Sequence, residues 1–179
     1  MEETLEPKTE VTTKSTGIKF GLIMAAISIA YFMIMNVMGI DMSQGFGRWG
    51  GLIFNVVVIF FAHKSFKEGS NGYMSYGQGL GIGMWIALIS SVISSIFTYI
   101  YVKFIDAEFI KMMMEKQEEQ MQERGMSEEQ IKQAMDMTAK FMTPEMMLGF
   151  GIFFGFIILI AVFALVTIFT QKKNPEAVI

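Results

Sequence analysis

The chain has 179 residues, of which 53% are hydrophobic and 17% are charged, and its formal net charge is −3. A negative net charge excludes the basic field that attracts nucleic acid. The lack of cysteine excludes disulfides, thiolate metal sites and a cysteine nucleophile, and the single histidine excludes a centre built from several histidines of one chain.

Long uncharged stretches predict four transmembrane helices. The first covers residues 18–40, which at 1.5 Å per residue is enough to span a hydrocarbon core of about 30 Å. The second covers residues 49–66 and has a short apolar centre, so an interfacial or re-entrant element is the alternative to a full crossing. Trp49 at one of its ends, and His63 with Lys64 at the other, suit the two membrane interfaces. The third and fourth cover residues 77–105 and 146–170.

The segment between the last two spans is charged and predicts a helical hairpin. Ser127 and Gln130 have the spacing of a capping box at the start of the second arm, and Gly125 suits the end of the first. Thr143 and Pro144 predict the start of the fourth span. Because no helix-breaking residue occurs near Asp106, the first arm is expected to continue the third span as one long rod.

These elements predict an all-α protein, a four-helix membrane bundle with an extramembrane hairpin between helices three and four. Its expected parts are a polar N-terminal tail, three spans, the hairpin, the fourth span and a C-terminal tail, at residues 1–16, 17–105, 106–143, 144–171 and 172–179. The tail is acidic and no small-residue cleavage pattern follows the first apolar run. Both features favour a retained first helix over a cleaved signal peptide.

Basic residues in the short flanks predict the topology. Four crossings place the N-terminal flank, the loop between spans two and three, and the C-terminal tail on one side, with seven lysines there: Lys8, Lys14, Lys19, Lys64, Lys67, Lys172 and Lys173. The short turn on the other side carries Arg48 alone. The positive-inside rule therefore predicts cytoplasmic termini and an extracytoplasmic hairpin.

Small residues recur every four positions along the third span, at Gly79, Gly83, Ala87, Ser91 and Ser95. The fourth span offers Gly151 and Gly155 at the same spacing. In lipid, small residues let helix backbones approach closely. The pattern predicts helix packing inside one chain, and a dimer face is the alternative.

Asn36 and Asn55 are the polar residues that stand out within the first two spans. Their distances from the turn between those spans place them at similar depth, which predicts a hydrogen bond between them. A polar element of a conduction path is the alternative. The lack of an acidic or basic residue at the centre of any span argues against ion-coupled transport.

Ten of the eighteen methionines lie between Met112 and Met147. Thioethers are soft ligands that select Cu(I), so this region is compatible with a copper site. The alternative is that the methionines fill the apolar seam of the hairpin or meet the membrane surface. Nothing else in the sequence predicts a metal or a cofactor, and no nucleophile–base or carboxylate pair predicts catalysis.

The layout resembles a family of uncharacterised four-span bacterial membrane proteins, a domain of unknown function common in the Bacteroidetes. The resemblance covers the first span from Gly17, the stretch SYGQGLGIGMWIALISSVISSIFTYIY, the charged insert and the last span after Thr143-Pro144. It implies an inner-membrane location, and it assigns no role to any residue.

The sequence thus predicts a non-enzymatic inner-membrane protein, an accessory or scaffold protein that acts through helix packing and its hairpin. Its expected partners are the lipid bilayer and either a second copy or another membrane protein, and not nucleic acid. Two alternatives are a small oligomeric transporter or channel and a methionine-rich Cu(I)-handling protein.

Overall fold

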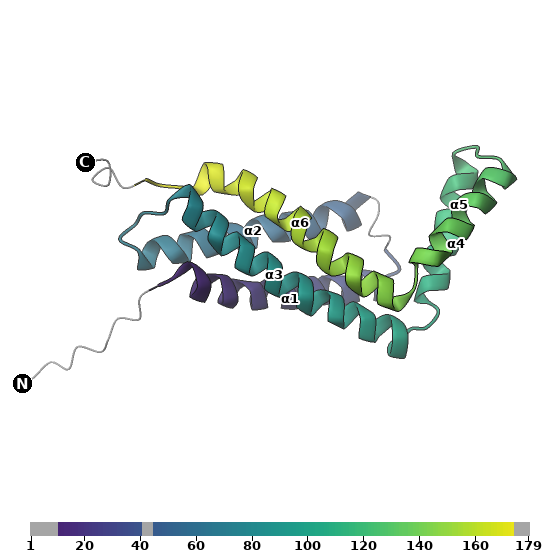
Figure 1. Ribbon diagram of the computed structural model, residues 1–179, viewed down its shortest axis with the longest axis horizontal. Coiled ribbons are helices and arrows are strands. Elements are labelled where there is room, and N and C mark those ends of the chain that lie inside the picture. The colour runs from purple at the N-terminus through teal and green to yellow at the C-terminus, as the bar shows by residue number, and fades with distance from the viewer. Residues whose placement is uncertain (1–10, 41–44, 174–179) are drawn as a thin grey trace, which may run out of the picture. The chain divides into compact units, whose positions relative to one another are not determined.

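The computed structural model describes residues 11–40 and 45–173, and its regular elements there are helical (Figure 1). In chain order they are α1 (Thr13–Val37), α2 (Gly45–Gly69), α3 (Tyr76–Ile100), a π-helical turn (Tyr101–Ile105), α4 (Phe109–Glu123), α5 (Glu128–Phe141) and α6 (Pro144–Thr170). Over this part of the chain, four helices are long and apolar enough to cross a membrane, namely α1, α2, α3 and α6. The predicted all-α fold class with four membrane helices is therefore confirmed. The second span is longer than the sequence predicted, because it continues to Gly69.

The described chain packs as two compact units whose boundary falls inside α3 and α6. Unit 1 contains the residues up to Ser90 and those from Phe156 onward, and unit 2 runs from Ser91 to Gly155. Parts of the predicted tails, residues 1–10 and 174–179, lie outside the described residues, as do residues 41–44 of the turn after α1.

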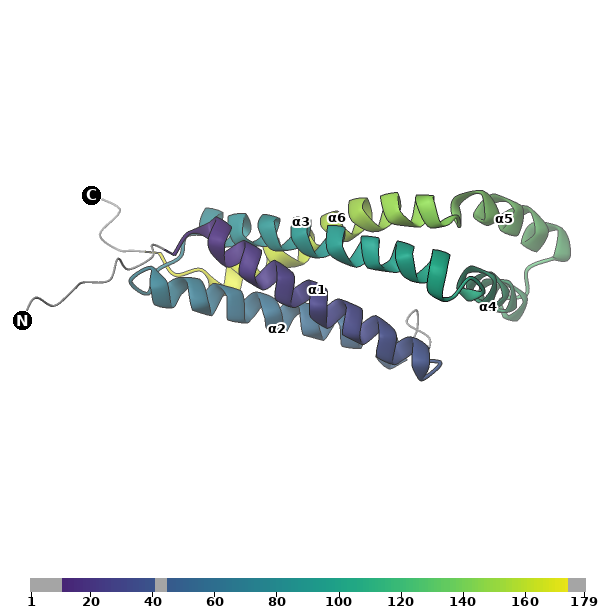
Figure 2. The ribbon, with the colours of Figure 1, turned by 90° about the horizontal axis from the view of Figure 1, so that it is seen from below.

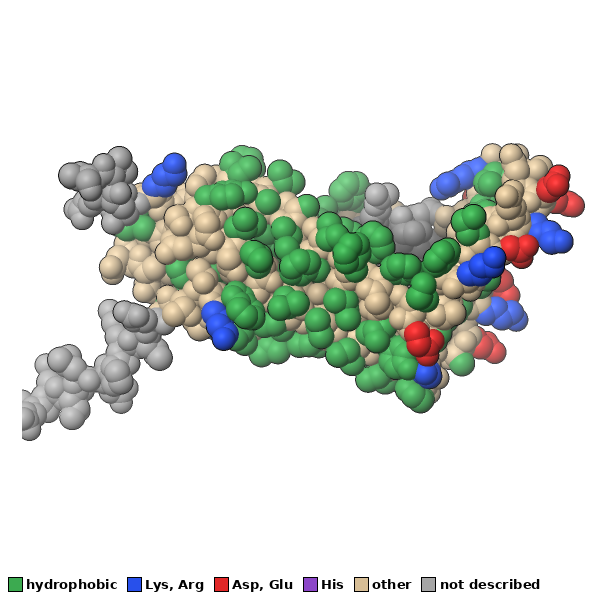
Figure 3. Space-filling view, viewed as in Figure 1, with side chains coloured by type: hydrophobic (Ala, Val, Ile, Leu, Met, Phe, Trp, Pro, Cys, Tyr) green, Lys and Arg blue, Asp and Glu red, His purple; other side chains and the backbone are tan. Residues whose placement is uncertain are grey.

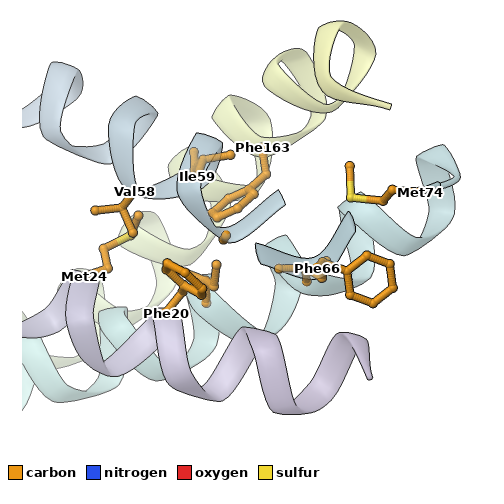
Figure 4. Packing of buried hydrophobic residues seen from close by; sticks show 10 residues of the cluster. Phe20, Met24, Val58, Ile59, Phe66, Met74 and Phe163 are labelled. Carbon is orange, nitrogen blue, oxygen red and sulfur yellow. The ribbon is translucent and has the colours of Figure 1, made fainter. Parts of the chain in front are cut away.

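Unit 1 has a core of buried apolar side chains contributed by α1, α2, α3 and α6 (Figure 4). Phe20 and Met24 come from α1, and Phe163 comes from α6. On α2 the buried residues are spaced three and four apart, as expected for one face of a helix: Val58, Ile59, Ala62 and Phe66. The intervening Phe60 and Phe61 are exposed, which places them on the face that meets lipid.

Local capping chemistry fixes the ends of the hairpin helices. The Ser127 side chain accepts from the Gln130 amide, and the Gln130 side chain accepts from the Ser127 amide, so the predicted capping box is confirmed. Gly125 has a φ of +74°, the left-handed conformation expected after a helix end. Thr143 Oγ1 accepts from the Met146 amide at 3.3 Å as α6 begins.

The expected rod from α3 into α4 is wrong, because the helix breaks at Asp106. The last turn of α3 widens into the π-helical turn, where the Asp106 amide donates to the Tyr101 carbonyl at 2.9 Å. The Tyr101 hydroxyl also donates to Asp106 Oδ2 at 3.3 Å. Phe109 is buried with its ring edge-on to Tyr101, at a centroid distance of 6.0 Å. The contacts of Tyr101 thus end the helix at Asp106, although the sequence there contains neither glycine nor proline.

Within unit 2, α4 and α5 lie side by side and return the chain to α6 (Figure 2). Ile131 of α5 is buried, and Gln117 Nε2 of α4 donates to Thr138 Oγ1 at 3.4 Å. Where the hairpin adjoins the membrane helices, Lys103 Nζ lies 2.8 Å from Glu145 Oε1 and donates to the Tyr99 hydroxyl at 2.6 Å. This ion pair joins the end of the third span to the first turn of α6.

Candidate functional site

His63, the single histidine of the chain, is fully buried in unit 1. It lies on the face of α2 that carries Ile59, Ala62 and Phe66, so helical periodicity turns it into the core. The next residue, Lys64, lies about 100° further round the helix and is exposed. A buried ionisable side chain inside a membrane helix is a candidate functional group, because polar groups are costly in lipid unless they are paired.

Both ring nitrogens of His63 have partners on other helices. Nδ1 lies 2.7 Å from Thr170 Oγ1 on α6, and Nε2 lies 3.3 Å from the Gly79 carbonyl oxygen on α3. One turn further along α2, Lys67 Nζ donates to the Thr170 carbonyl at 3.0 Å. These four residues, named here the His63 cluster, join one end of α2, α3 and α6.

The chemistry of the partners determines the tautomer of the histidine. The Gly79 carbonyl can only accept, so Nε2 must carry the hydrogen. Nδ1 of the neutral ring then accepts from the Thr170 hydroxyl. The Val166 carbonyl, 3.0 Å from Thr170 Oγ1, is a second acceptor for the same hydroxyl hydrogen, so Nδ1 and this carbonyl share it. A neutral His63 therefore has a hydrogen-bond partner for each ring nitrogen and adds no charge of its own to this end of the helices.

A pair of backbone hydrogen bonds closes this end of unit 1. Met74 and Lys172 exchange amide-to-carbonyl hydrogen bonds of 2.9 and 2.8 Å, which ties the loop before α3 to the residues after α6. The Met74 side chain is fully buried. A Cβ atom at Gly79 would lie 3.1 Å from the Met74 methyl carbon and 2.6 Å from Thr167 Cγ2, so Gly79 is close to both elements.

The small residues of α3 lie against α6 in both units. In unit 1, a Cβ atom at Gly83 would lie 2.5 Å from the Phe163 ring, and Ala87 is fully buried. In unit 2, a Cβ atom at Gly151 would lie 2.6 Å from Ser95 Oγ. A Cβ atom at Gly155 would likewise lie 3.4 Å from the Cβ of Ser91. The contacts between α3 and α6 thus use this strip within the chain.

Glycines of α1 receive side chains from the opposite side of α3. A Cβ atom at Gly17 would overlap the Trp85 side chain, and one at Gly21 would lie 3.0 Å from the Cβ of Ile89. The two helices therefore approach closely where α1 has no side chains.

Asn36 and Asn55 are half-buried on α1 and α2. The hydrogen bond expected between them stays a prediction. Tyr31, which the sequence did not single out, also joins these helices: its hydroxyl donates to the Gly47 carbonyl at 2.6 Å, and its ring lies edge-on to Phe54.

Within residues 11–40 and 45–173, no group of three or more His, Cys, Asp or Glu side chains could hold a metal ion. Met112, Met113 and Met114 are consecutive on α4, where each residue turns by about 100° from the last, so these three cannot converge on one ion. Met112 is exposed and the other two are half-buried. The Cu(I) alternative stays a prediction, and a site would need methionines from more than one turn.

A family model described as a protein of unknown function, DUF4199, matches residues 19–172. The chain belongs to the DUF4199 family. The matched residues include most of α1, all of α2 to α6 and the bridge residue Lys172, so the expected resemblance to a four-span family of unknown function is confirmed. No match was found among functionally curated proteins or among solved structures.

Sequence reasoning placed His63 of this DUF4199 chain beside Lys64 at an interface and missed its burial. A signal was present, because Ile59, Ala62, His63 and Phe66 are spaced three and four apart. The partners Thr170 and Gly79 had no comparable signal. They lie 107 and 16 residues away in the chain and meet His63 only through tertiary packing.

Proposed function

We propose that this DUF4199 protein is a non-enzymatic accessory or scaffold protein of the bacterial inner membrane. Both termini face the cytoplasm, and the α4–α5 hairpin lies outside, where it contacts another protein. The membrane helices hold the hairpin in place, and recognition occurs through the polar face of the hairpin.

The observation that carries this proposal is a division of roles between polar groups. In the described part of unit 1, the polar atoms of the His63 cluster bond to one another and join helices. Most charged residues of the hairpin are exposed, and examples are Glu129, Lys132 and Asp136 on α5. Buried, paired groups suit packing, whereas exposed charges of both signs suit selective contact with a partner.

The proposed topology predicts opposite labelling of two single-cysteine variants. The chain contains no cysteine, so each variant has one reactive thiol. Glu128→Cys, on the hairpin, should react with a membrane-impermeant maleimide in intact spheroplasts. Glu68→Cys, at the exposed end of α2, should react only after permeabilisation. The reverse pattern would overturn the orientation.

The scaffold function is tested by photocrosslinking from the hairpin in native membranes. A benzophenone maleimide on Lys132→Cys should give one defined protein adduct, and the same probe on the exposed Leu165→Cys of α6 should give none. Reversal of a neighbouring charge, Asp136→Lys, should reduce the adduct several-fold. If both positions recover only background proteins and no dimer, the proposal is wrong.

A further inference from the structure

An exposed apolar edge runs along the second half of α5. Met137 is 60% exposed and Phe141, one turn later, is 48% exposed. Residues four apart lie on the same side of a helix, so the two side chains share one edge. Asp136 and Lys140 are exposed beside them, about 100° further round the helix. This half of α5 is therefore amphipathic, with an apolar edge that stays exposed at Met137 and Phe141.

This edge is continuous with the surface of α6 that meets lipid. The ring centroid of Phe141 lies 6.1 Å from that of Phe150, and Phe150 lies 5.8 Å from Phe154. Phe150 and Phe154 belong to α6 and are exposed. All three rings lie within unit 2, so this row of aromatic rings passes from a membrane-spanning helix to α5 inside one compact unit.

The direction of the hairpin allows this edge to lie along the bilayer surface. At the junction of α5 and α6, Met142 has a φ of −89° and a ψ of 49°, which interrupts the helix before Pro144 begins the next. Figure 1 shows the hairpin turning away from the direction of the adjoining end of α6. Figure 3 shows hydrophobic side chains over the long helices and acidic and basic side chains gathered on the hairpin.

We propose that α5 is an interfacial helix whose edge, formed by Met137 and Phe141, inserts between the lipid headgroups and the upper acyl chains. Continuity with the lipid-facing aromatic residues of α6 identifies lipid as the occupant. Amphipathic helices bind in this way, with the apolar side immersed and the charged side in water. Lys140 lies beside the immersed edge, where its ammonium group meets lipid phosphates. The proposal does not depend on the partner protein or on the orientation proposed above.

Nitroxide labels on single-cysteine variants test this insertion in the full-length protein. The variants are reconstituted into vesicles of phosphatidylethanolamine and phosphatidylglycerol, and power-saturation spectroscopy compares collisions with oxygen and with a water-soluble nickel chelate. Labels at Met137→Cys and Phe141→Cys should favour oxygen, as should a reference label at the exposed Phe153→Cys of α6. A label at Asp136→Cys should favour the nickel chelate by several-fold.

Two results would overturn the proposal. If Met137→Cys is as accessible to nickel as Asp136→Cys, the edge lies in water. If the label is protected from both reagents and shows dipolar broadening, a second copy covers the edge instead of lipid. Met137 is the more exposed position, so Met137→Cys decides the matter even if Phe141→Cys does not fold.

Discussion

Replacement of His63 by alanine is expected to lower the free energy of unfolding by about 3 kcal/mol, of which about 2 kcal/mol comes from the cavity that the ring leaves. The ring is fully buried beside Phe163, at a centroid distance of 6.2 Å, so its removal leaves a cavity that rigid helices fill only in part. Loss of two interhelical hydrogen bonds adds about 0.6 kcal/mol each, the average for membrane proteins. Equilibrium unfolding in mixed detergent and dodecyl sulfate micelles measures the change.

Lys64→Ala is the matched control for this variant. Lys64 is the next residue of the same helix, and its side chain is exposed, with a 3.9 Å contact to Glu68. An exposed pair of this kind contributes little, so the control should change stability by less than about 0.5 kcal/mol. Equal effects of the two variants would show that the His63 cluster does not stabilise unit 1.

A double-mutant cycle separates the hydrogen bond from the packing of the ring. Thr170→Val removes the hydroxyl that contacts His63 Nδ1 and keeps the shape of the side chain. Its effect should be greater with histidine at position 63 than with alanine there. The expected coupling is about 0.6 kcal/mol and at most about 1.7 kcal/mol.

The parts of the fold that depend on local rules could be read from the sequence. A bilayer needs about 20 apolar residues for each helical span, and this length criterion located α1, α3 and α6. The ends of the hairpin helices were predicted from the capping residue Ser127 and from the glycine at position 125, which has a positive φ in the structure. Each of these signals lies within a few residues of the feature that it predicts.

The parts that depend on tertiary contacts could not be read in this way. In water, the apolar side of a helix marks the core, but in lipid both sides are apolar. Ile59 is buried and the adjacent Phe60 is exposed, although both are large hydrophobic residues. The turn at Asp106 was missed for a related reason, because Tyr101 and Phe109 form it through side-chain contacts.

Small residues are the exception to this rule, because in a membrane helix their size indicates where another helix can pack closely. Gly83→Ala is expected to destabilise the protein by about 1–3 kcal/mol, the usual cost of overfilling a packed interior. The new Cβ would lie 2.5 Å from Phe163 Cγ and 2.7 Å from Phe163 Cβ. These atoms are close to the backbone of α6, and Phe163 is fully buried, so the helices must separate. The same unfolding experiment measures the loss.

A control and a rescue distinguish this clash from a general effect of removing a glycine. Gly149 lies within α6 with no atom inside 4 Å of an added Cβ, so Gly149→Ala should be neutral or slightly stabilising. Phe163→Ala alone should destabilise the protein by leaving a cavity. Combined with Gly83→Ala, it should cost less than the sum of the two changes, because the added methyl group occupies space that the lost ring leaves empty. Strict additivity would mean that Gly83 and Phe163 do not set the distance between α3 and α6.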